Sequence, residues 1–146
     1  MIFQDFRLIP DLNVYDNVAF VLRVTNKPKK TIRHRVPYVL NLVKLVERAK
    51  AYPDTLSGGE KQRVAIARAF ASDPKLIIAD EPTANIDPAL SYDIVKLLKE
   101  INKCGTTVIM VTHEHSLVEY FGGRIVSLKN GEVIFDEYVE GEAQDE

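Results

Sequence analysis

The chain has 146 residues, room for one modest domain, and its 46% apolar and 27% charged residues exclude a disordered chain. The 19 basic residues against 21 acidic ones give a net charge of −2, so no strong overall field favours nucleic acid as a partner. The one cysteine, Cys104, cannot form a disulfide within the chain, which favours a reducing cytosolic compartment, and no apolar run is long enough to span a membrane.

Three helices are predicted in the first half of the chain. The first spans 14–24, because valines recur on one face and Asn13 is a suitable cap. The second spans 31–49 and contains Pro37, which either kinks this helix or marks its true first turn. The third spans 58–71 and is rich in Ala, Arg and Gln.

The charge is concentrated in two stretches. Residues 23–50 carry nine bases and one acid, Glu47, whereas residues 136–146 carry only acids. The nine bases are Arg23, Lys27, Lys29, Lys30, Arg33, Arg35, Lys44, Arg48 and Lys50. The acidic end is predicted to be a solvated tail. For the basic stretch two interpretations stay open: a solvated helical face, or a surface that contacts an anionic membrane or a partner.

Strands and helices alternate in the second half. The predicted elements are a strand over 76–79, a helix over 88–103, a strand over 106–111, a helix over 116–121, and strands over 124–128 and 132–135. The first strand is a continuous apolar run, which suits burial on both faces, and the second is a buried β-branched run. The last two strands flank an Asn-Gly turn typical of a hairpin. This alternation predicts an α/β fold with a mainly parallel sheet.

Two adjacent carboxylates, Asp80 and Glu81, directly follow the strand predicted over 76–79. Ligand groups collect at the carboxyl ends of strands in open α/β sheets, and two carboxylates there are costly without a positive partner. Magnesium that carries phosphates is the natural candidate: one carboxylate reaches the metal through its water shell, and its neighbour polarises an attacking water. The alternative is a pair of caps for the next helix.

Two further features suit a phosphate site. His113 follows the next strand, where it either forms a structural hydrogen bond or contacts a terminal phosphate or its attacking water; we expect it near Glu81. Ser57, Gly58 and Gly59 open the third helix, where bare N–H groups and the helix dipole form an anion site. The alternative there is a flexible turn capped by Ser57.

Together these pieces resemble the ATP-binding-cassette (ABC) ATPases over essentially the whole chain. The matching segments are Phe3-Gln4 for the glutamine loop, 56–63 for the signature sequence, 76–82 for the Walker B strand, 84–87 for the D-loop and His113 for the switch histidine. The flanking segments 3–10, 14–20, 80–88, 100–102 and 105–108 look like the cell-division branch of the family. Its lipoprotein-release and macrolide-export branches share much of this pattern and stay as alternatives.

The resemblance implies a fold of the P-loop NTPase type and a dimer in which two cassettes enclose two ATP molecules. Each ATP lies between one subunit's P-loop and the other's signature sequence. Ser57, Gly58 and Gly59, with Glu60 beside them, would then contact the ATP held by the partner cassette, and Asp87 would couple the two sites.

The resemblance also implies the roles of the remaining site residues. Asp80 and Gln4 would hold Mg²⁺, Glu81 would be the general base, and His113 would contact the γ-phosphate. A helical subdomain over 11–72 would precede part of the catalytic core over 73–138 and an acidic tail over 139–146. The helical stretch to about Ala51 would meet a transmembrane partner at the cytoplasmic face of the plasma membrane.

The family's P-loop, G-x-x-x-x-G-K-[ST], is missing from these residues, because none of the 7 glycines precedes a lysine. The family carries this loop upstream of the glutamine loop, so we expect a truncated or mis-started gene product or a fragment, with one face of its sheet open. An ATPase subunit and a non-hydrolysing remnant that only binds partners both stay open. A DNA-repair or chromosome-maintenance ATPase head is disfavoured, since no coiled coil is present.

Overall fold

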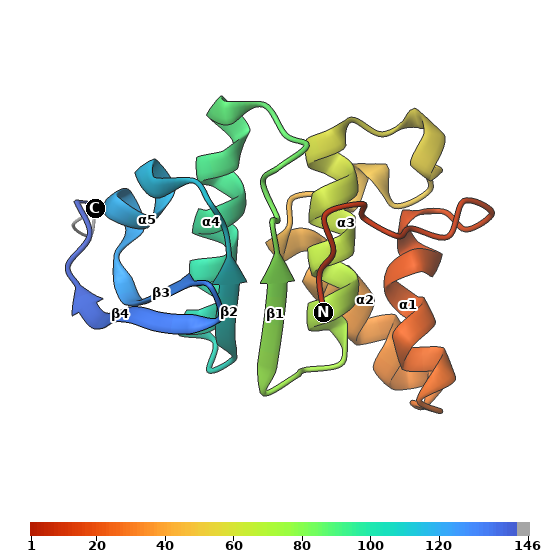
Figure 1. The fold of residues 1–146 in the computed structure, drawn as a ribbon. Helices are drawn as coiled ribbons and strands as arrows, with labels where there is room; N and C mark the ends of the chain where they lie inside the picture. Colours follow the sequence, from red (N-terminus) through yellow and green to blue (C-terminus); the bar gives the residue numbers. More distant parts are fainter. Residues whose placement is uncertain (143–146) are drawn as a thin grey trace. The chain divides into compact units, whose positions relative to one another are not determined.

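The computed structural model describes residues 1–142 and divides the chain into two compact units, Met1–Val111 and Thr112–Glu146. The first unit contains three helices followed by a β-α-β segment, and the second contains a short helix and a hairpin (Figure 1).

The first helix, α1 (Val14–Val24), has the predicted bounds. Its predicted cap is confirmed, because Asn13 Oδ1 accepts a hydrogen bond from the N–H of Asp16 at 2.8 Å. One turn later Asn17 is fully buried; its side chain accepts from the N–H of Ile9 at 2.9 Å and donates to the carbonyl of Ile9 at 3.1 Å. This amide fixes the loop that enters the helix.

The second helix, α2 (Lys29–Leu42), ends earlier than the predicted 31–49. Lys44 adopts a left-handed conformation with φ 58°, and the N–H of Leu45 bonds back to the carbonyl of Leu40 at 2.9 Å. A left-handed residue followed by such a backbone hydrogen bond ends many helices, and the periodicity of apolar residues does not predict it. The hydrophobic pattern therefore continues beyond the helix itself.

Pro37 lies inside α2, so it does not mark the first turn of that helix. Two short 3₁₀ turns, η1 (Val46–Arg48) and η2 (Pro53–Thr55), connect α2 to α3 (Gly58–Ala71), which has the predicted bounds. The three helices pack on one another through buried aliphatic and aromatic side chains: Val18, Leu22, Val36, Val39, Leu40, Ile66 and Phe70.

The β-α-β segment consists of β1 (Leu76–Asp80), α4 (Pro88–Lys103) and β2 (Thr107–Val111). The two strands are parallel, with Asp80 opposite Val111, and they lie side by side in Figure 1. Ile2 forms a further parallel bridge with Ala79 of β1. The chain segment before the glutamine-loop residues therefore runs along β1 and ends near its carboxyl end.

The prediction that β1 is buried on both faces is wrong, and β2 is less buried than predicted. Ile77 and Ala79 are buried, but Leu76 and Ile78 are 47% and 37% exposed, and Ile109 of β2 is 49% exposed. One face of the strand pair is thus open, which confirms the expectation of an open sheet face. An apolar run indicates what a strand is suited to, not what covers it.

In the second unit, α5 (His115–Phe121) precedes an antiparallel hairpin of β3 (Gly123–Lys129) and β4 (Glu132–Val139). The Asn-Gly turn is confirmed: Asn130 and Gly131 both have positive φ, 52° and 83°, as a two-residue hairpin turn requires. Both strands are longer than predicted, because cross-strand pairing extends to Val139.

No helix in residues 1–142 is both long and apolar enough to cross a membrane. The subdomain boundaries predicted after residues 72 and 138 stay predictions. The boundary between the two compact units lies between residues 111 and 112. Residues 143–146 of the predicted acidic tail lie outside the described residues.

Candidate nucleotide site

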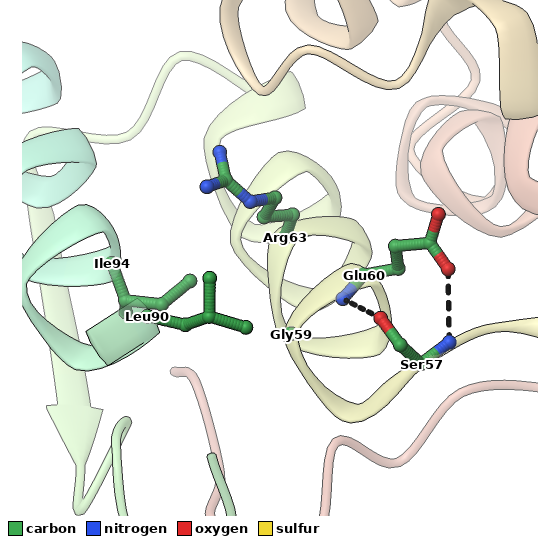
Figure 2. A pocket seen from close by; sticks show the side chains of 6 residues that line it. All are labelled: Ser57, Gly59, Glu60, Arg63, Leu90 and Ile94. Atoms are coloured by element: carbon green, nitrogen blue, oxygen red, sulfur yellow. Dashed lines mark hydrogen bonds between the residues drawn. The ribbon is translucent and has the colours of Figure 1, made fainter. Parts of the chain in front are cut away.

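The start of α3 is fixed by a reciprocal pair of hydrogen bonds between Ser57 and Glu60. The hydroxyl of Ser57 accepts from the N–H of Glu60 at 3.2 Å, and the Glu60 carboxylate accepts from the N–H of Ser57 at 2.9 Å (Figure 2). Arg48 donates to the same carboxylate at 3.0 Å. The Ser57 N–H, and after it Arg48, hold the pKa of Glu60 below its usual value. Ser57 is therefore a cap, as one interpretation predicted, and its orientation is defined.

The two glycines after Ser57 allow α3 to approach the segment 85–90 closely. A Cβ on Gly58 would lie 3.2 Å from the carbonyl oxygen of Asn85, and one on Gly59 would lie 3.2 Å from Leu90. The N–H of Glu60 is taken by the cap. Among the described residues, the amides of Gly58 and Gly59 are thus the donors of the first turn that the capping box leaves for an anion.

A hollow of about 380 Å³ lies beside this helix start. Its lining residues are Ser57, Gly59, Glu60, Arg63, Leu90 and Ile94. In Figure 2 the side chains of Leu90 and Ile94 point from α4 toward α3. Arg63, one of the lining residues, pairs with Asp93 at 3.5 Å, and the N-terminus of α3 lies at the same hollow. Both features favour an anionic ligand.

The carboxylates Asp80 and Glu81 lie at the end of β1, as predicted. The alternative that they cap the next helix is wrong, because Asp87 caps α4: its carboxylate accepts from the N–H of Ala89 at 2.9 Å. Glu81 begins a tight turn, has φ 46°, and donates its N–H to the carbonyl of Val111 at 2.9 Å. The turn aims the chain away from the sheet at the point where both strands end.

The glutamine-loop residues are tied to this region through the backbone. Asn85 donates its side-chain N–H to the carbonyl of Gln4 at 3.2 Å. Arg68 of α3 donates to the carbonyls of Phe6 and Arg7, at 3.1 and 2.7 Å, and its burial lowers its pKa. Phe6 and Arg7 both have positive φ, so Arg68 stabilises a strained turn. The fold thus places Gln4 beside the D-loop segment.

The donor chemistry of Asp80 and Gln4 fits magnesium. One carboxylate and one amide oxygen are hard oxygen ligands, and Mg²⁺ typically takes one or two carboxylates together with waters and phosphate oxygens. Within residues 1–142, no three His, Cys, Asp or Glu side chains form a metal-binding group. Two oxygen ligands would leave the remaining positions of an octahedral Mg²⁺ for water and phosphate oxygens.

His113 belongs to the second unit, whereas Glu81 belongs to the first. Each unit has a defined internal structure, and the distance between these two side chains stays a prediction. Close to His113, Thr112 accepts from the N–H of Glu114 at 3.1 Å, which fixes the chain entering α5.

Sequence reasoning missed Gln62 and Arg68. Gln62 is fully buried and donates to the carbonyl of Pro82 at 2.7 Å. The signal was present: Gln62 lies one and two helical turns before Ile66 and Phe70, on the apolar stripe of α3. An amide on an apolar stripe indicates a specific buried partner.

Comparisons with known proteins agree with this arrangement. Residues 1–84 match the family model described as "ABC transporter". The chain is 52% identical over 136 residues to the cell division ATP-binding protein FtsE of Mycobacterium tuberculosis, covering 93% of this chain and 59% of the relative. It is 47% identical over 135 residues to the methionine import ATP-binding protein MetN of Haemophilus ducreyi, covering 92% and 39%.

The fold is also found among solved structures. A dimeric, post-hydrolysis state of the ATP-binding cassette MJ0796, bound to ADP and Pi, superposes with a TM-score of 0.80 at 40% identity, covering 96% of this chain and 62% of that one. The predicted fold class is confirmed, and so is the resemblance to cell-division ATPases. The chain spans about three fifths of the length of the FtsE relatives it matches.

Proposed function

This chain belongs to the ABC transporter family, and we propose that it forms the signature and Walker B part of an ATPase of the FtsE type. The observation that carries the proposal is the start of α3, where a fixed Ser57 and the amides of Gly58 and Gly59 border a hollow with a basic side chain. Phosphate is the ligand that such a helix start suits best. The similarity to FtsE relatives supports the cell-division branch.

In the proposed site, Ser57, Gly58 and Gly59 donate hydrogen bonds to the γ-phosphate of an ATP held by a second cassette. Glu60 keeps Ser57 in position through the capping box. Asp87, at the start of α4, faces the second cassette and couples the two sites. The dimeric state of the related cassette supports this arrangement.

Hydrolysis converts ATP and water into ADP and phosphate. Asp80 and Gln4 would hold Mg²⁺, which supplies charge neutralisation at the phosphates when bound. Glu81 takes the proton from the attacking water, and His113 hydrogen-bonds the γ-phosphate. A complete site also needs a P-loop, and its motif does not occur in these 146 residues.

The membrane partner in this proposal is an FtsX-like transmembrane protein, contacted at the cytoplasmic face of the plasma membrane. Six bases of the stretch 23–50 are exposed and, among the described residues, form no ion pair: Lys27, Lys29, Lys30, Arg33, Lys44 and Lys50. They supply a basic surface for the partner and the anionic lipids around it. A methionine-importer subunit is the second candidate, supported by the 47% identity to MetN.

The test uses a fusion, named here the fused cassette, in which the P-loop-bearing segment of the Mycobacterium tuberculosis FtsE relative precedes Met1. It should hydrolyse ATP, and Glu81→Gln should lower turnover by at least about 10²-fold because a general base contributes roughly that factor. ATP binding should persist, since the amide keeps the shape of the side chain. The 146-residue chain alone should show no turnover above background.

Glu100→Gln, on the exposed face of α4, removes the same charge and is the matched control. Turnover that survives Glu81→Gln would contradict the assigned role. So would a collapse of ATP affinity in that variant, which would mark Glu81 as a metal-binding or structural group.

A further inference from the structure

The turn after β1 holds Glu81 in a conformation that its surroundings must maintain. Its φ of 46° lies in the left-handed region, which residues other than glycine rarely adopt. The N–H of Glu81 donates to the carbonyl of Val111 at 2.9 Å, and its carbonyl accepts from the N–H of Ala84 at 3.2 Å. Such a conformation persists only where neighbouring contacts over-determine it.

Gln62 adds a contact to this turn from α3. Its Nε2 donates to the carbonyl of Pro82, the residue after Glu81, at 2.7 Å across 20 positions of sequence. Because a carbonyl only accepts, the amide nitrogen must face it. The ring of Pro82 already fixes its own φ, so holding its carbonyl fixes the remaining backbone freedom beside Glu81.

Packing alone does not explain a glutamine at this position. Gln62 is 0% exposed and its Oε1 is buried, yet this oxygen accepts no hydrogen bond within residues 1–142. A buried polar atom without a partner is unfavourable, and an apolar side chain of similar volume would fill the space without that cost. We therefore assign the function of the Gln62 amide to its nitrogen, which donates to the carbonyl of Pro82.

We propose that Gln62 is a positioning residue that sets the orientation of Glu81. The inference rests on the proposed role of Glu81 as the general base. Ser57 and Gln62 are carried by the same rigid helix start, five residues apart, so a phosphate bound at Ser57 and the turn at Glu81 are linked through one element. Movement of α3 on nucleotide binding then reaches the base through the Gln62–Pro82 bond.

The first test needs no enzymatic activity and uses the 146-residue chain. Hydrogen–deuterium exchange of the Glu81 and Ala84 amides is followed by NMR in wild type and Gln62→Met, which keeps the volume and removes the donor. Exchange of both amides should become about ten-fold faster, the factor expected when one buried hydrogen bond is lost. The melting temperature should stay near that of wild type, because the unpaired Oε1 is removed as well.

Lys61→Met, one position earlier on α3, is the matched control and should leave both amides unchanged. Wild-type exchange at Glu81 and Ala84 in Gln62→Met would overturn the proposal. So would an equal acceleration at amides throughout α1, because that result would show general loosening instead of a local role.

The second test uses the fused cassette. Gln62→Met should lower kcat about ten-fold while KM for ATP stays unchanged, since only the orientation of the base is affected. An unchanged kcat, or a rise in KM with kcat intact, would overturn the proposal. If wild-type fused cassette hydrolyses no ATP, the proposed function fails, and the exchange measurement still decides whether Gln62 positions the turn.

Discussion

Two helices of the first unit, α2 and α3, carry side chains of opposite charge at their N-termini. α3 begins with Ser57 as its cap and has an acid, Glu60, in its first turn. α2 begins after Pro28, with no side-chain cap and no acid in its first turn, and it places Lys29 and Lys30 there instead. Helix N-termini carry partial positive charge, so acids there stabilise and bases destabilise.

In the proposed function, this difference corresponds to two kinds of anionic partner. At α3 the carboxylate of Glu60 offsets the positive charge of the helix start beside a small hollow. The amides of Gly58 and Gly59 stay available, and such a site suits one phosphate group. At α2 no acidic side chain among the described residues offsets the positive charge of the first turn. Lys29 and Lys30 lie there, within an exposed run from 23 to 31. Such a surface suits an extended array of negative charge, such as an anionic bilayer.

The largest expected effect breaks the α2 side of this comparison. Lys27→Glu/Lys29→Glu/Lys30→Glu should lower binding to phosphatidylglycerol-containing vesicles by about two orders of magnitude, because each base near an anionic bilayer contributes about 1 kcal/mol. Flotation at low salt measures this binding, which should weaken for wild type as salt rises. Vesicles of phosphatidylcholine alone should bind neither protein.

A matched control places the same change of charge elsewhere. Lys75→Glu/Lys96→Glu/Lys103→Glu alters three exposed lysines outside the basic stretch and should float nearly as well as wild type. If both triple variants lose binding equally, only net charge matters. If the first variant floats as wild type does, the stretch is a solvated face.

A smaller effect sharpens the comparison through stability. Ser57→Ala should lower the free energy of unfolding by about 1 kcal/mol, the usual cost of losing a cap. Lys30→Glu should raise it by about 0.5 kcal/mol, since it places an acid in the first turn of α2. Urea unfolding of the 146-residue chain measures both, and a loss of stability in Lys30→Glu would refute the electrostatic reading of α2.

Local signals predicted much of the first unit correctly. α1, α3 and α4 have their predicted bounds, because each combines a capping side chain with a continuous amphipathic pattern and a clear end. The end of α2 was missed since its termination depends on the backbone conformation at Lys44. The open face of β1 and β2 could be expected only from the resemblance to a family, because apolar periodicity does not identify the covering layer.

The candidate site divides in the same way. The positions of Ser57 at the start of α3 and of Asp80 and Glu81 at the end of β1 could be predicted, since the glycines after Ser57 and the acids after a strand are local signals. For Gln62 the apolar stripe of α3 indicates burial, but neither its partner nor that of Arg68 could be predicted, because the carbonyls of Pro82 and Arg7 lie 20 and 61 positions away. Long-range bonds to backbone carbonyls have no counterpart in the sequence pattern.

The phosphate role of the α3 start is tested most directly by Ser57→Asp in the fused cassette carrying Glu81→Gln. Aspartate caps a helix as well as serine does, so the melting temperature should not change, but its charge would repel a γ-phosphate at that position. Asn13→Asp makes the equivalent change at the cap of α1. The ATP-dependent dimer, measured by light scattering, should persist with Asn13→Asp and disappear with Ser57→Asp; an undiminished dimer with Ser57→Asp would contradict a phosphate site at α3.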